Sequence, residues 1–160
     1  MFGPEWEQGC KSCAFWADSF DHMAPHLAAR DVAFAAVSRA PPSKLSAFRA
    51  RMGWGFPWVS SLGSDFNYDF GVSFRADERQ AGAVTYNYRK GSLPREEAPG
   101  ISVFARNQAG AVFHTNSTFG HGLDLMNAAC DYLDLVPKGR DKQGLDWTMQ
   151  WVRLRNEYKS

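Results

Sequence analysis

Two cysteines separated by two residues carry the clearest chemical signal in this chain. They lie in the segment Cys10-Lys11-Ser12-Cys13, whose spacing is that of a redox dithiol or of two ligands of a metal site. A thiolate is the species that attacks a disulfide, and a second thiol nearby can resolve the mixed disulfide. The pair therefore predicts thiol–disulfide exchange, in which Cys10 attacks and Cys13 resolves.

A helix is expected to position these thiols, because apolar residues recur after Cys13 at helical spacing. They are Trp16, Phe20, Met23 and Leu27. The helix would run to about Arg30, with a kink at Pro25. Unpaired N–H groups and the helix dipole stabilise a thiolate at a helix N-terminus. With the positive charge of Lys11 close by, we expect a depressed pKa at Cys10.

Two other interpretations of the cysteine pair are a zinc site and inert packing. Zinc would need four ligands, and His22 and His26 supply the missing two. The residues between the cysteines and the histidines are too few for a zinc finger and look helical. The histidines are therefore interpreted as surface residues, and no metal site is predicted. The cysteines could also be inert packing residues, which is the interpretation given to Cys130 on its apolar helical face.

The rest of the chain predicts an α/β layer architecture. The apolar run Val32–Ser38 is typical of a strand buried in a parallel sheet. The other expected elements are a helix over Lys44–Met52 ended by Gly53, a turn and strand within Trp54–Ser61, a hairpin of Ile101–Phe104 and Ala111–Thr115, a helix from about His121 to Leu135, and an amphipathic helix over Trp147–Tyr158.

Length and composition exclude several classes of protein. The 160 residues, 44% of them apolar, predict one globular domain over residues 1–160. A net charge of +1 provides no basic surface for nucleic acid. No apolar run is long enough to span a membrane, and no charged leader followed by an apolar segment is present. We therefore expect neither a nucleic-acid nor a membrane partner, and the cytoplasm is the expected location.

Three aromatic-rich strings resemble the DUF899 family of thioredoxin-like proteins. They are WEQGCKSCAFWAD at Trp6–Asp18, GWGFPWVSS at Gly53–Ser61 and DFNYDFGV at Asp65–Val72. The resemblance extends over nearly the whole chain. It implies a thioredoxin-like fold, with a central mixed sheet flanked by helices. It also implies a thiol–disulfide role toward protein or small-molecule disulfides, without a cofactor.

The chain is also similar to thioredoxins on both sides of a substrate groove. Trp6 lies four residues before Cys10, and Pro99-Gly100 precedes an apolar strand, as the cis-proline of thioredoxins does. The resemblance thus implies a groove formed by Trp6, Pro99 and Gly100, with a cis bond before Pro99. The alternative is that Pro99 simply begins a strand.

The similarity to thioredoxins is incomplete at the N-terminus. Only five residues precede Trp6, so the chain is expected to lack the N-terminal strand or strands of that fold. An upstream start, a second copy in a homo-oligomer or the tail Trp147–Tyr158 would then have to complete the sheet. We expect the 160-residue chain to be less stable and more prone to self-association than a longer one. The buried acid of thioredoxins has no counterpart, and only Glu5, Glu7 and Asp18 are close in sequence.

Two functions compete with thiol–disulfide exchange. In a peroxiredoxin-like peroxidase Cys13 would attack peroxide, but the motif P-x-x-x-T-x-x-C would need proline at Trp6 and threonine at Cys10. A non-enzymatic binding module would instead present an aromatic partner surface made of Trp54, Phe56 and Trp58. Core packing is the favoured interpretation of these three aromatics, because large aromatic side chains are mostly buried.

Overall fold

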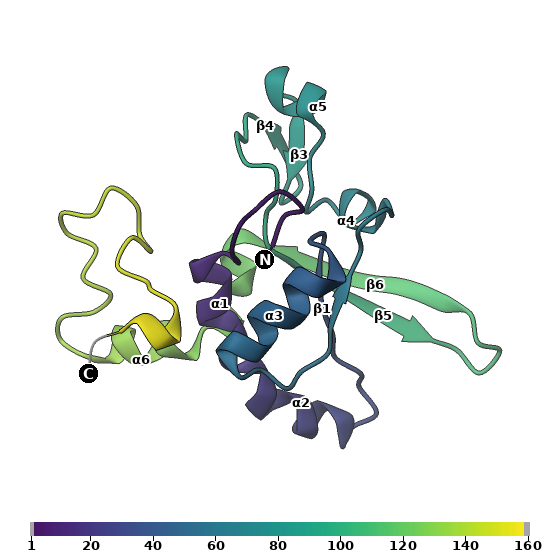
Figure 1. The fold of residues 1–160 in the computed structure, drawn as a ribbon, viewed down its shortest axis with the longest axis horizontal. Helices are drawn as coiled ribbons and strands as arrows, with labels where there is room; N and C mark the ends of the chain where they lie inside the picture. Colours follow the sequence, from purple (N-terminus) through teal and green to yellow (C-terminus); the bar gives the residue numbers. More distant parts are fainter. Residues whose placement is uncertain (1, 159–160) are drawn as a thin grey trace. The chain divides into compact units, whose positions relative to one another are not determined.

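The computed structural model describes residues 2–158 and has a mixed α/β architecture (Figure 1). The described chain forms two compact units, one of residues 2–62 and 124–158 and the other of Gly63–Leu123. Within residues 2–158, every helix is too short or too polar to cross a membrane.

The N-terminal part of the first unit contains three α-helices and two β-strands. They are α1 Lys11–Ala17, α2 Phe20–Ala28, β1 Ala36–Ser38, α3 Pro42–Met52 and β2 Trp58–Ser60. Its C-terminal part contributes α6 Ala128–Leu135 and the 3-10 helix η2 Arg155–Glu157. The second unit contains α4 Phe66–Asp69, α5 Ala76–Gln80, β3 Val84–Tyr86, β4 Arg89–Gly91, β5 Gly100–Arg106 and β6 Val112–Phe119. A 3-10 helix, η1 Gly120–Met126, leads from its last residues into α6.

The long helix expected after Cys13 is two helices, and the break is not at Pro25. It lies at Asp18 and Ser19, between α1 and α2. The Ser19 hydroxyl donates a 2.8 Å hydrogen bond to the Trp16 carbonyl, a local bond of the kind that competes with continuation of a helix. Pro25 lies inside α2.

A parallel strand pair joined through α3 forms the sheet of the first unit. β1 and β2 pair in parallel with Ala36 opposite Trp58, as the apolar run predicted, although β1 is shorter than Val32–Ser38. Val32 is 47% exposed, so the start of the run lies outside the sheet. The helix α3 has Pro42 in its first turn and ends at Gly53, whose φ of 68° suits glycine.

A single central mixed sheet is not present in residues 2–158. The strands form three separate two-stranded sheets, β1–β2, β3–β4 and β5–β6. The expectation of one central sheet is therefore wrong for the described chain. Strands of three residues offer too few backbone groups for a broad sheet, so side-chain packing has to supply the stability of this unit.

Aromatic side chains supply much of that packing. Trp54, Phe56 and Trp58 are 5%, 2% and 8% exposed, and the ring centroids of Trp54 and Trp58 are 5.6 Å apart. Phe48 of α3 packs edge-on against Trp54 at 5.7 Å. The core interpretation of the three aromatics is confirmed, and they are too deeply buried to form a partner surface.

The second unit is built around two antiparallel hairpins. β5 and β6 pair from Gly100 opposite Phe119 to Arg106 opposite Val112, which confirms and lengthens the expected hairpin. The β3–β4 hairpin was not expected from the sequence. Its turn residues Asn87 and Tyr88 both have positive φ, 51° and 60°, as hairpin turns with two left-handed residues require. The usual glycine signal is absent there.

The C-terminal part of the first unit departs from expectation in two places. Asn127 separates η1 from α6, so the expected helix over 121–135 is only partly α-helical. The amphipathic helix expected over Trp147–Tyr158 is wrong, because only the short η2 forms. Val152 and Leu154 are buried at 0% and 1% exposure, and side chains two residues apart share a face in extended chain, not in a helix.

Candidate functional site

The two cysteines occupy the start of α1, as predicted. Cys10 is the N-cap residue with an extended backbone, and its carbonyl accepts a 2.9 Å hydrogen bond from the Ala14 amide. Cys13 is the third residue of the helix and is buried, whereas Cys10 is partly exposed. The geometry therefore presents one thiol toward solvent and keeps the other beneath it.

Hydrogen bonds at the helix start lower the pKa of the Cys10 thiol from 9.0 to about 5. The largest cause is a hydrogen bond from the Cys13 thiol. The amides of Cys13 and Ser12 act in the same direction, and burial opposes them. These amides are the unpaired donors of the first helical turn. Lys11 contributes less than expected, since its charge is not among the main causes.

The same hydrogen bond has the opposite effect on Cys13. The pKa of Cys13 is raised well above 9.0, first because its thiol proton is held by the Cys10 sulfur and second because the side chain is buried. A thiol in this state is a poor first nucleophile. The arrangement thus fits Cys10 as the attacking residue, and it disfavours a peroxidase in which Cys13 attacks.

The segment before Cys10 is fixed to α3 by specific contacts. The Lys44 ammonium donates hydrogen bonds of 3.1 Å to the carbonyls of both Pro4 and Trp6. Gly9 passes so close to Phe48 that a Cβ atom would lie 2.9 Å from its ring. Trp6 itself is half-buried against the core. The segment that leads to Cys10 is therefore held in place by α3, a feature that sequence reasoning missed because Lys44 is distant in sequence.

Pro99 and Gly100 lie in the second unit, whereas Trp6 and the cysteines lie in the first. Every peptide bond in residues 2–158 is trans, so the expectation of a cis bond before Pro99 is wrong. Pro99 directly precedes β5, as the alternative interpretation held. A Cβ on Gly100 would lie 2.6 Å from Val72, so close packing explains this glycine. A groove shared by Trp6, Pro99 and Gly100 stays a prediction.

The residues considered for proton transfer have other surroundings. Asp18 lies at the far end of α1, where it accepts a 2.8 Å hydrogen bond from the Trp54 indole and lies 3.7 Å from the Arg155 guanidinium. Glu5 and Glu7 are exposed. Asp18 thus stabilises the core instead of serving the thiols.

His22 and His26 lie exposed on α2, as interpreted. Among residues 2–158, no three histidine, cysteine or acidic side chains come together in a group that could hold a metal ion. Cys130 is buried, as expected of a core residue, and accepts a 3.1 Å hydrogen bond from the Asn127 amide group. Burial raises the pKa of its thiol.

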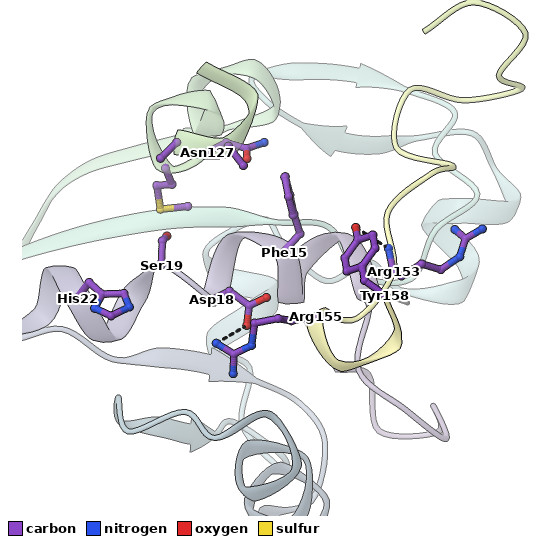
Figure 2. A pocket seen from close by; sticks show the side chains of 11 residues that line it. Phe15, Asp18, Ser19, His22, Asn127, Arg153, Arg155 and Tyr158 are labelled. Carbon is purple, nitrogen blue, oxygen red and sulfur yellow. Dashed lines mark hydrogen bonds and ion pairs between the residues drawn. The ribbon is translucent and has the colours of Figure 1, made fainter. Parts of the chain in front are cut away.

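A cavity of about 390 Å³ lies at the C-terminal end of α1, beside Phe15, Asp18 and Ser19 (Figure 2). It is lined by the end of α1, the beginning of α6 and the C-terminal segment, and its residues are Phe15, Asp18, Ser19, His22, Met126, Asn127, Ala128, Ala129, Arg153, Arg155 and Tyr158. Arg155 pairs with Asp18, and the Tyr158 hydroxyl accepts a hydrogen bond from the Arg153 amide. The charged groups here are occupied in holding the C-terminal segment.

One comparison with known proteins identifies a relationship. The model of the family DUF899, described as "Bacterial protein of unknown function", matches residues 1–158. No curated protein and no solved structure gave a significant match. The chain belongs to the DUF899 family.

Proposed function

We propose that this DUF899 protein is a thiol–disulfide oxidoreductase whose dithiol is Cys10 and Cys13, on a thioredoxin-like architecture. The observation that carries the proposal is the asymmetry of the two thiols. Cys10 is partly exposed with a pKa lowered to about 5, and Cys13 is buried with a raised pKa. The parallel β1–α3–β2 arrangement and the dithiol at the start of α1 support the likeness to thioredoxins.

The reaction transfers two electrons between the protein and a substrate. With the protein oxidised, a substrate thiolate attacks the Cys10 sulfur, and the bond between Cys10 and Cys13 breaks as Cys13 leaves and takes up a proton. The second substrate thiolate then attacks the substrate sulfur of the mixed disulfide, and Cys10 leaves as a thiolate. The substrate dithiol becomes a disulfide, and the protein becomes a dithiol.

The reverse reaction begins with attack by Cys10 on a substrate disulfide and ends when Cys13 resolves the mixed disulfide. The low pKa of Cys10 stabilises the reduced protein and makes this thiolate a good leaving group. We therefore propose that transfer of the disulfide to substrate is the favoured direction. Reoxidation requires a disulfide oxidant, for which glutathione disulfide serves in an assay.

Single cysteine variants test the proposal. Oxidised protein is mixed with a reduced two-cysteine peptide, and disulfide formation in the peptide is followed by mass spectrometry. The wild type should exceed the rate given by glutathione disulfide alone. Cys10→Ser should lose this activity, and Cys13→Ser should lose it because it cannot form the Cys10–Cys13 disulfide. In the reverse direction, reduced Cys13→Ser mixed with a disulfide substrate should accumulate a mixed disulfide on Cys10, because Cys13 is the thiol that resolves it.

Cys130→Ser is the matched control and should keep full activity, because Cys130 is distant from the dithiol in sequence and buried elsewhere. Peroxide consumption is measured on the same variants. A wild type without exchange activity, or a Cys10→Ser variant that consumes peroxide through Cys13, would refute the oxidoreductase.

A further inference from the structure

The C-terminal segment lies along one face of α1, and its residue nearest the dithiol is Trp147. Three pairs of residues join them in the same order. The Lys11 ammonium lies 5.9 Å from the ring centroid of Trp147, the Phe15 ring packs edge-on against Trp151 at 5.6 Å, and Asp18 lies 3.7 Å from Arg155. On the helix side these positions are four and three residues apart, which places them on one face. The segment thus lies beside α1 from Lys11, the residue after Cys10, to Asp18 at the far end.

This segment is firmly anchored at the end remote from the cysteines. Val152 and Leu154 are completely buried. The Arg155 guanidinium donates a hydrogen bond to the Met52 carbonyl, and Glu157 pairs with Arg51 at 2.9 Å. Trp147 is connected to these anchors by a tight turn, in which the Gln150 amide donates to the Trp147 carbonyl at 3.0 Å. Its place beside Lys11 is therefore set by the fold.

Trp147 is 43% exposed although it is held in place. Its ring lies against the ammonium of the residue that directly follows Cys10. Tryptophan is one of the residue types enriched among those that carry most of the binding energy at protein interfaces. A ligand whose sulfur bonds to Cys10 can contact this ring only if it has a further group next to that sulfur.

We infer that Trp147 is a specificity-determining residue, which receives an apolar side chain next to the reacting cysteine of a polypeptide substrate. This inference rests on the proposed function and names its substrate class. A small thiol such as glutathione reaches the Cys10 sulfur without having such a side chain to place on the ring. Polypeptides with an apolar neighbour beside the cysteine should therefore be preferred.

The test compares the reactions of three reduced thiols with the oxidised 160-residue protein. They are a two-cysteine peptide with leucine beside each cysteine, the same peptide with glycine at those positions, and glutathione. With the wild type, the leucine peptide should react faster than the glycine peptide. Trp147→Ala should slow the leucine peptide about fivefold or more, and it should leave the glycine peptide and glutathione unchanged. Trp147→Phe, which keeps an aromatic ring, should retain most of the preference.

Trp151→Ala is the matched control, since it removes the same side chain from the same segment one turn farther from Cys10. It should lower the melting temperature without changing the ratio of the two peptide rates. If the wild type reacts with all three thiols but Trp147→Ala keeps the leucine preference, the inference is overturned and the oxidoreductase stands. If the wild type reacts with none of them, the proposed function fails and the inference fails with it.

Discussion

Burial and the direction of one hydrogen bond distinguish the two thiols at the start of α1. The Cys13 proton points to the Cys10 sulfur, so it lowers the pKa of one thiol and raises that of the other. The amides of the first helical turn add to the effect at Cys10, because they are directed at the N-cap position. Reactivity at this site is thus a property of the pair.

The pH dependence of alkylation follows from this asymmetry. In the reduced protein, the rate at which iodoacetamide modifies Cys10 should rise with a midpoint near pH 5 and then level off. Cys13 and Cys130 should stay slow near neutral pH, since the pKa of each is raised. Peptide mapping across pH measures all three rates.

Cys13→Ala tests how much of the lowered pKa of Cys10 comes from the Cys13 thiol and how much from the amides of the helix start. Loss of the largest contribution should move the Cys10 midpoint to higher pH, while the amide hydrogen bonds continue to lower the pKa and burial continues to raise it. An unchanged midpoint in this variant would show that the Cys13 thiol does not control Cys10.

Oxidation should join Cys10 to Cys13 within one chain. Residues three apart in a first helical turn can bring their sulfurs within bonding range, and the hydrogen bond between them already places the thiols together. Cys130 is buried beside Asn127 and should remain a thiol. The measurement is peptide mapping of the oxidised protein by mass spectrometry under non-reducing conditions. A disulfide of Cys130 as the main product would contradict this prediction.

At the site, sequence reasoning found the parts that are local in sequence. The spacing of Cys10 and Cys13 predicted the helix start and the asymmetry, because both depend on one turn of chain. Lys44 and Trp147 were missed as parts of the site. Their contacts depend on tertiary folding, and neither residue belongs to a motif that could have revealed them.

At the scale of elements, the carboxylate of Asp21 connects α2 to the loop before β2. It accepts hydrogen bonds from the Gly55 amide at 2.9 Å and from the Phe56 amide at 2.6 Å. Asp21→Ala should lower the free energy of unfolding by about 1–3 kcal/mol, because two amides lose a charged acceptor. Chemical denaturation measures the change.

Asp31→Asn is the control for this variant. Asp31 is exposed and has a left-handed backbone with φ of 58°, which asparagine tolerates well. Its substitution should leave stability nearly unchanged. If Asp31→Asn destabilised the protein as much as Asp21→Ala, the loss could not be assigned to the amide hydrogen bonds.

The elements predicted best were those with complete local signals. For α3, the prolines at its start and Gly53 at its end fix both limits, and for β5–β6 the glycine turn fixes the pairing. The errors arose where tertiary contacts decide. Val152 and Leu154 are buried from an extended segment, although the sequence around them has helical periodicity. Ser19 interrupts the first helix, although the apolar pattern continues past it.

For the whole molecule, the dithiol should link stability to pH. The folded pKa of Cys10 is about 5, compared with 9.0 for an ordinary thiol. The stabilisation is therefore complete above pH 9 and is lost as the pH falls to 5. Between these values the reduced protein should gain up to about 1.4 kcal/mol per pH unit over Cys10→Ser.

Above pH 9 the trend should reverse, because the raised pKa of Cys13 opposes its ionisation in the folded state. The comparison is made by urea unfolding of both proteins at matched pH values, so that the other titrating groups cancel. The oxidised protein has no thiol at Cys10 or Cys13. Its free energy of unfolding should therefore lack the pH dependence that these two thiols cause. A constant difference between the two reduced proteins from pH 5 to 9 would contradict the lowered pKa.

The placement of the tryptophans gives the two compact units different optical properties. All six, at positions 6, 16, 54, 58, 147 and 151, lie in the first unit, and Gly63–Leu123 has only phenylalanine and tyrosine as aromatic residues. Fluorescence excited at the red edge of indole absorption thus reports the first unit alone, whereas far-ultraviolet circular dichroism reports both. Coincident melting curves would identify one cooperative unit. A circular dichroism transition without a change in emission would belong to the hairpins of Gly63–Leu123.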